Sequence, residues 1–225
     1  MDTKIKIMNN KNLLLAVQSY PGANDTVKRH YPYWLRAGAS RIVGISTTGG
    51  GCEFPNGMES VEIGINSYIN GDILSRRLLD TIGWMLTQPE EWFCIIEYDT
   101  IFIKEISNLK LGATMHLTGW HTLPDTTNPF YHNPWIMDRN TAIKLKETGE
   151  RLLIEKKEML GCPDVCMGRM VTESKVDIHE FELYTQNTID HNIDHILEAQ
   201  RLVKNSLITA IHGIKSIETF NIITQ

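Results

Sequence analysis

Two acidic side chains stand at the end of an apolar run near the middle of the chain. The run covers residues 92–96, and Glu97 and Asp99 follow it with only Tyr98 between them. Residues two apart in an extended chain lie on the same side, so the two carboxylates are expected to be neighbours. Because neighbouring carboxylates repel, the pattern predicts a hard divalent cation with oxygen ligands. The alternative is an ordinary solvated strand end.

A second candidate segment lies near the C-terminus, where the sequence reads Ile211-His212-Gly213-Ile214-Lys215. A histidine after an apolar strand can present its imidazole to a metal ion, and a lysine close behind it can meet a phosphate. Taken alone, the segment is more typical of a turn with a surface lysine.

A third candidate is Asp164, which follows Pro163 at a predicted helix start. Proline suits the first position of a helix, and a carboxylate in the first turn is favoured by the helix dipole. The same placement can also direct a carboxylate into a cleft as a general base. The residues leave both interpretations open.

Several other patterns argue against particular chemistries. The glycine run at 49–51 lacks the Lys-Ser/Thr of a phosphate loop, no GxGxxG follows a strand, and no GxSxG occurs. His191 and His195 have a metal-ready spacing but no accompanying HExxH glutamate. We interpret them as part of a solvated helix start, with Asp190 as its N-cap.

The elements that must position these residues alternate between strand and helix in the first half of the chain. The patterns predict strands at 13–19, 41–46, 61–66 and 92–96, and helices at 25–37 and 70–86. We expect an irregular aromatic loop at 107–135, helices at 138–157, from 165, and at 190–203, and a last strand at 207–211. Such alternation predicts an α/β fold with a mostly parallel central sheet flanked by helices.

Composition sets the remaining limits. The 225 residues are 42% hydrophobic and 22% charged, with a net charge of −5, which excludes a disordered, collagen-like or coiled-coil chain. No apolar run approaches the roughly 20 residues of a membrane span, and no secretory pattern is present. The length suits one domain over 1–225. The four cysteines are unevenly spaced and show no disulfide framework, so we expect a reducing compartment: the cytoplasm, or the host cytoplasm if the protein is viral.

The order of these features resembles the GT-A class of nucleotide-sugar glycosyltransferases. The resemblance implies a Mn²⁺ or Mg²⁺ ion on Glu97, Asp99 and His212, with glutamate standing where the class usually has its first aspartate. It implies that Lys215 meets the diphosphate of the donor and that Asp164 is the catalytic base. It also divides the chain into a donor half at about 12–106 and an acceptor half at about 107–225.

Further binding residues follow from the same resemblance and from residue type. The candidates for donor binding are Gln18, Ser19 and Tyr20 at the end of the first strand, Tyr98, and Arg76 or Arg77. The candidates for stacking on an acceptor are Trp120, His121 and Trp135, whose alternative is a packed irregular loop.

The expected reaction is transfer of a sugar from a nucleoside-diphosphate sugar to an acceptor hydroxyl. The acceptor could be a saccharide, a protein or a hydroxylated base in phage DNA. Two other functions remain open on the sequence: a non-catalytic module that binds a nucleotide or glycan, and a nucleotidyltransferase with similar carboxylate–metal geometry.

Overall fold

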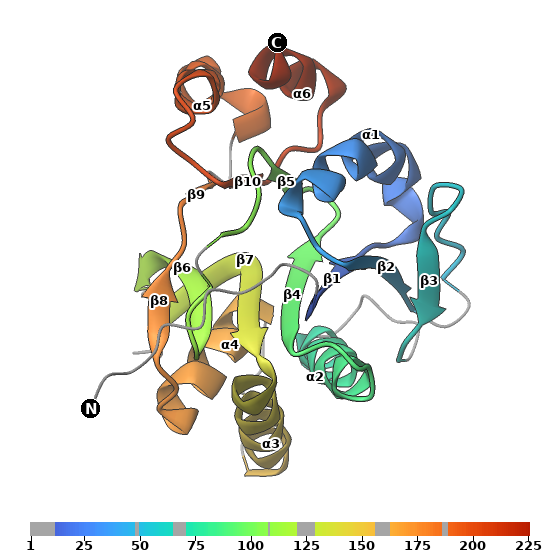
Figure 1. Ribbon diagram of the computed structural model, residues 1–225, viewed down its shortest axis with the longest axis vertical. Helices are drawn as coiled ribbons and strands as arrows, with labels where there is room; N and C mark the ends of the chain where they lie inside the picture. The colour runs from blue at the N-terminus through green and yellow to red at the C-terminus, as the bar shows by residue number, and fades with distance from the viewer. Residues whose placement is uncertain are drawn as a thin grey trace.

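A seven-stranded sheet forms the centre of the molecule (Figure 1). The computed structural model describes residues 12–47, 50–64, 71–107, 109–120, 129–155, 163–185 and 189–225. In spatial order the strands are β3 Glu59–Glu62, β2 Arg41–Ser46, β1 Leu13–Gln18, β4 Trp92–Glu97, β7 Pro129–Asp138, β6 Ala113–Trp120 and β8 Ile178–Glu180. The predicted α/β fold with a mostly parallel sheet is confirmed, since only the β4–β7 and β7–β6 pairs are antiparallel.

The first strand is apolar because both of its faces are covered. Every residue of β1 is buried. Leu14 and Ala16 belong to one core, and Leu13, Leu15 and Val17 belong to another on the opposite side. Continuous apolar runs of this kind are typical of parallel strands that are buried on both faces.

Helices cover the two faces of the sheet. Helices α2 Gly71–Leu86, α3 Arg139–Glu155 and α4 Pro163–Ser174 contribute to the first core, and α1 Asn24–Trp34 contributes to the second. Short 3-10 turns flank α1 at Pro21–Ala23 and Leu35–Ala37. Gly38 closes this segment as predicted, at a positive φ of 74° that favours glycine.

The loop predicted at 107–135 is wrong for residues 113–120 and 129–135, which belong to the antiparallel strands β6 and β7. The register of the pair shifts between Thr114 and His116, opposite a part of β7 that includes Asn133 and Pro134. Proline cannot donate a ladder hydrogen bond, so it is tolerated at such an irregularity. The turn-forming residues of this stretch therefore mark a bulge within a sheet.

A second, three-stranded sheet lies beside the carboxyl end of β4. Its order is β5 Ile101–Phe102, β10 Ala210–His212 and β9 Leu183–Thr185. Helices α5 Ile193–Lys204 and α6 Ile217–Thr224 pack with it in a third core. Figure 1 shows these C-terminal elements grouped at one end of the molecule, beyond the edge where β4 ends.

Several predicted boundaries differ from the structure. The expected strands at 61–66 and 207–211 are β3 and β10, displaced by a few residues, and β8, β9 and α6 were not expected. Asp190 does not cap α5. Asn192 is the N-cap, because its side chain accepts a hydrogen bond from the backbone N–H of Asp194.

The strand order creates a switch point between β1 and β4. The chain runs outward from β1 through β2 to β3 and then returns to β4 on the other side of β1. Gln18 and Glu97, the last residues of β1 and β4, are register partners. Ligands of open α/β sheets bind outside the carboxyl ends of the strands at such a point.

Within the described ranges, no helix has the length and apolar character needed to cross a membrane.

Asp138 joins β7 to α3 and supplies a testable contribution to stability. Its side chain accepts hydrogen bonds from the backbone N–H of Thr141 at 2.9 Å, from the Thr141 hydroxyl at 2.9 Å, and from the backbone N–H of Gly112. Asp138→Ala should lower the free energy of unfolding by about 1–2 kcal/mol, because a helix cap is lost. Asp138→Asn, which keeps a capping oxygen, should cost less. Urea unfolding measures both, and an alanine variant within about 0.5 kcal/mol of wild type would contradict this role.

Candidate metal and phosphate site

A tight turn, rather than strand alternation, brings the two acidic side chains together. β4 ends at Glu97, and the backbone N–H of Thr100 donates to the carbonyl of Glu97 at 3.1 Å. Tyr98 remains attached to β1, because its N–H donates to the carbonyl of Gln18 at 2.9 Å. The chain therefore reverses at the sheet edge, and Asp99 comes back beside Glu97.

The backbone of Asp99 also positions the histidine of the second predicted segment. Its carbonyl accepts hydrogen bonds from the N–H groups of Gly213 and Ile214, at 3.2 and 3.1 Å. Gly213 has a φ of 97°, a conformation that favours glycine, so the chain can turn immediately after His212. The end of β10 is thus fixed to the turn that carries the acidic residues.

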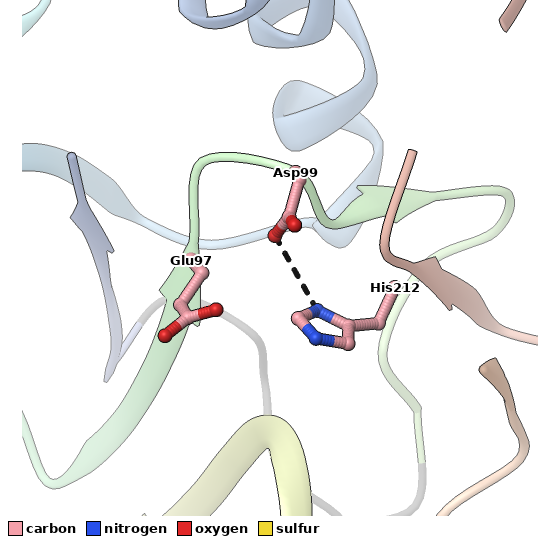
Figure 2. Close-up of side chains that lie close together, drawn as sticks. All are labelled: Glu97, Asp99 and His212. Atoms are coloured by element: carbon pink, nitrogen blue, oxygen red, sulfur yellow. Dashed lines mark ion pairs between the residues drawn. The ribbon is translucent and has the colours of Figure 1, made fainter. Parts of the chain in front are cut away.

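Glu97, Asp99 and His212 form one cluster, in which one potential ligand atom from each lies within 4.8 Å of the others. Figure 2 shows Glu97 and Asp99 on one segment, the end of β4 and the turn after it, with the ring of His212 opposite them. The Nδ1 atom of His212 lies 3.5 Å from Oδ1 of Asp99. That oxygen is buried and accepts no hydrogen bond from the part of the chain that the structure describes. Two carboxylates and an imidazole are suitable donors for Mn²⁺ or Mg²⁺.

Burial and like-charge repulsion disfavour the charged forms of Glu97 and His212. Burial raises the pKa of the Glu97 carboxyl to about 8, and the negative charges of Asp99 and Asp164 act in the same direction. Burial also lowers the pKa of His212 below its usual value, which favours the neutral imidazole that binds metals. A divalent ion would relieve the carboxylate repulsion and use the neutral ring.

Lys215 stands at the exposed side of the cluster. Its Nζ atom lies 3.6 Å from Oδ2 of Asp99, and its side chain is 61% exposed. The backbone N–H groups of Lys215 and Ser216 donate to Asp190, at 2.9 and 3.2 Å, and the Lys215 carbonyl accepts from Arg29 at 2.8 Å. The backbone is held while the ammonium group remains accessible to an anion.

The structure brings Asp164 near the cluster through a second histidine. Asp164 lies in the first turn of α4, and its Oδ2 is 3.6 Å from Nδ1 of His132 on β7. The ring centroids of His132 and His212 are 5.3 Å apart. The charge of Asp164 also acts on the pKa values of Glu97 and His212. Asp164 therefore lies close enough for its charge to act on two residues of the cluster, and its carboxylate lies beside the ring of His132.

The candidate donor residues Gln18, Ser19 and Tyr20 lie at the carboxyl end of β1, and the first two are buried. The Gln18 side chain donates to the Thr81 hydroxyl at 3.1 Å, and Ser19 is 2% exposed. The rings of Tyr20 and Tyr98 pack edge to face, with centroids 5.1 Å apart. The two tyrosines are therefore the partly exposed members of this group.

The structure separates the two candidate arginines. Arg77 is buried, and its Nη2 donates to the carbonyls of Ser19 and Ile45, at 2.7 and 3.0 Å. Its charge lowers the pKa of Glu97 and so reaches the site. Arg76 points elsewhere and pairs with Asp80 and with Glu150 of α3. Only Arg77 belongs to the surroundings of the cluster.

The predicted acceptor role of Trp135 is wrong. Its ring is fully buried in the first core, and its indole N–H donates to the carbonyl of Tyr131 at 2.9 Å, so it offers no surface for stacking. Trp135 is instead a packing residue of β7. The side chain of Trp120 and all of His121 lie outside the described residues.

A cavity of about 200 Å³ extends from the cluster toward the C-terminal elements. Four predicted residues line it: Glu97, Asp99, His212 and Lys215. Its lining also includes Thr185, Asp190 and His191. The sequence does not single out Thr185, Asp190 or His132 as site residues, and its pattern favours a solvated helix start for His191. Chain spacing gives no sign that β7, β9 and the turn before α5 come together near the end of β4.

Comparison with known proteins adds no identification. No known protein family matches the chain, and no curated protein matches it in sequence. The functional argument therefore rests on the side chains of the site.

The raised pKa of Glu97 predicts a pH dependence of stability in the metal-free protein. The folded state holds the Glu97 proton up to about pH 8, whereas the ordinary carboxyl releases it near pH 4.5. The free energy of unfolding should therefore fall as the pH rises between these values. Glu97→Gln should remove this part of the decrease, because a neutral amide does not titrate.

Urea unfolding of chelator-treated protein from pH 5 to 8.5 measures this effect. Glu147→Gln, a change of an exposed glutamate on α3, is the matched control and should keep the wild-type slope. An unchanged slope in Glu97→Gln would show that Glu97 ionises normally.

Proposed function

We propose that the protein is a metal-dependent glycosyltransferase of GT-A type. It would transfer a sugar from a nucleoside-diphosphate sugar to the hydroxyl of an acceptor. The observation that carries the proposal is the cluster of Glu97, Asp99 and His212 at the carboxyl end of β4, with a buried Asp99 oxygen that accepts no hydrogen bond from the described residues. The cluster lies at the switch point between β1 and β4, and open α/β sheets bind ligands at such a point.

The cation would be held by the two carboxylates and the imidazole. When bound, it supplies positive charge that stabilises the departing nucleoside diphosphate. The exposed ammonium of Lys215 contributes charge of the same sign from the outer side of the cluster. Arg77 contributes from below the sheet edge, where it is fixed by two carbonyl groups.

Asp164 is the proposed general base. It would accept the proton of the acceptor hydroxyl as the bond between the sugar and the acceptor oxygen forms. The position of Asp164 at the start of α4 gives it a rigid backbone, and His132 lies 3.6 Å from its carboxylate. The pairing of a cation site with a nearby carboxylate supports transfer chemistry over simple binding.

The two other functions are distinguished by product analysis. A panel of nucleoside-diphosphate sugars is incubated with the protein and Mn²⁺ or Mg²⁺, with saccharides, hydroxymethylated DNA and protein as acceptors. Sugar transfer with formation of nucleoside diphosphate supports the proposal. A second incubation supplies a nucleoside triphosphate and a sugar phosphate, and release of pyrophosphate there indicates a nucleotidyltransferase. Binding without any turnover indicates a non-catalytic module.

Asp99→Asn should abolish metal-dependent donor binding, because it removes the charge of the most buried ligand. The fold should persist, since the neutral amide relieves repulsion at Glu97. Isothermal titration with the sugar donor in the presence of Mn²⁺ measures the loss, and circular dichroism checks the fold. Asp25→Asn, which changes an exposed aspartate of α1, should bind like wild type. Equal donor affinity in wild type with and without chelator would refute the metal requirement.

Asp164→Asn should lower turnover by roughly 10²–10⁴-fold with little change in donor affinity, because asparagine has nearly the same shape as aspartate but cannot accept the proton. Asp194→Asn is the matched control, since Asp194 also lies in the first turn of a helix but is exposed on α5. Steady-state kinetics compare the two variants. Near-normal turnover in Asp164→Asn would place the base elsewhere or indicate a retaining mechanism.

A further inference from the structure

A buried hydrogen-bond chain behind the cluster leads from Asn133 through Thr100 to His212. The Thr100 hydroxyl lies 2.8 Å from Oδ1 of Asn133 and 3.0 Å from Nδ1 of His212. Thr100 is fully buried and Asn133 is 1% exposed, so water does not compete for these contacts. The direction of each hydrogen bond follows from chemistry alone.

The orientation of the Asn133 amide is fixed first. The backbone N–H of Glu97 lies 3.1 Å from Oδ1 of Asn133 and can only donate. The amide oxygen must therefore face Glu97, and the same oxygen faces Thr100. Asn133 lies where the β6–β7 register shifts, two residues from Trp135, which is the last residue of β7 that pairs with β4.

The hydroxyl of Thr100 comes next. It has one hydrogen, and the amide oxygen of Asn133 can only accept, so that hydrogen is donated to Asn133. The hydroxyl oxygen is then left as an acceptor for His212. Nδ1 of His212 must carry the proton, and in the neutral ring Nε2 keeps the lone pair that can bind a metal ion.

The backbone of Thr100 makes this arrangement rigid. Its N–H donates to the carbonyl of Glu97, and its carbonyl accepts from the indole N–H of Trp34 at 2.7 Å. The nearest oxygen of Asp99 lies 3.5 Å from Nδ1, longer than a normal hydrogen bond. Thr100 is therefore the closest acceptor for the ring proton within the described chain.

We propose that Thr100 is a positioning residue that selects the metal-binding tautomer of His212. It acts through His212 and does not touch the ion. The inference rests on the proposed metal site. It adds that a residue other than the three ligands helps to set the affinity for the metal. Outer partners of this kind typically change metal affinity by about 10–100-fold when they are lost.

The test compares Thr100→Val, which keeps the shape but removes the hydroxyl, with Thr100→Ser, which restores the hydroxyl. Isothermal titration with Mn²⁺ alone should give an affinity about 10–100-fold weaker for Thr100→Val and near wild type for Thr100→Ser. Long-range ¹H–¹⁵N correlation spectra of the chelator-treated proteins report the tautomer directly. Wild type and Thr100→Ser should show a proton on Nδ1 of His212, and Thr100→Val should show this tautomer depleted.

The outcomes separate the two proposals. If wild type does not bind Mn²⁺, the proposed metal site fails, whatever the tautomer. If wild type binds Mn²⁺ but Thr100→Val binds it equally well, or Thr100→Ser is as weak as Thr100→Val, the role of Thr100 is overturned. A proton on Nε2 in wild type overturns it as well, and this measurement holds even where a variant does not fold.

Discussion

Repulsion between carboxylates at a buried strand end is the constraint around which the rest of the site is built. Glu97 and Asp99 are brought together by a turn that the sheet edge holds in place, and Asp164 adds a third negative charge nearby. The low dielectric of the interior makes this crowding costly unless protons or cations compensate it. Lys215 and Arg77 supply fixed positive charge, but neither lies among the three clustered groups. A divalent cation would complete the compensation.

The fold explains why distant parts of the chain meet at this point. Parallel strands place their carboxyl ends at one edge, and the reversal of strand order between β1 and β4 leaves room there for a ligand. The small sheet then delivers His212 from the C-terminal part of the chain, fixed by the carbonyl of Asp99. Antiparallel β7 delivers His132 and Asn133 from the other side. The site is thus a junction of both sheets, and the three clustered residues are separated by up to 115 positions in sequence (from 97 to 212).

Much of the central fold could be predicted, because β1, β2 and β4 are apolar runs whose burial on both faces is visible in the sequence. The acidic pair could be predicted for the same reason, since it interrupts such a run. The hydrogen bond between His212 and Thr100, and that between Thr100 and Asn133, could not be predicted, because they join three segments that are far apart in sequence. Asn133 also lies in a stretch whose turn-forming residues predicted a loop and not a strand. The sequence does not distinguish Arg77 from Arg76, because only the packing of α2 decides which guanidinium reaches the carbonyl of Ser19 at the end of β1.

The central claim is that the three residues hold a divalent cation, and anomalous diffraction tests it most directly. Crystals are grown with Mn²⁺ and a nucleoside diphosphate, and data are collected on the high-energy side of the manganese edge. The account predicts one strong anomalous peak within about 2.0–2.6 Å of a carboxylate oxygen of Glu97 and of Asp99 and of Nε2 of His212. Full occupancy of the nucleotide with no peak at these atoms, or a manganese ion bound elsewhere, would contradict it.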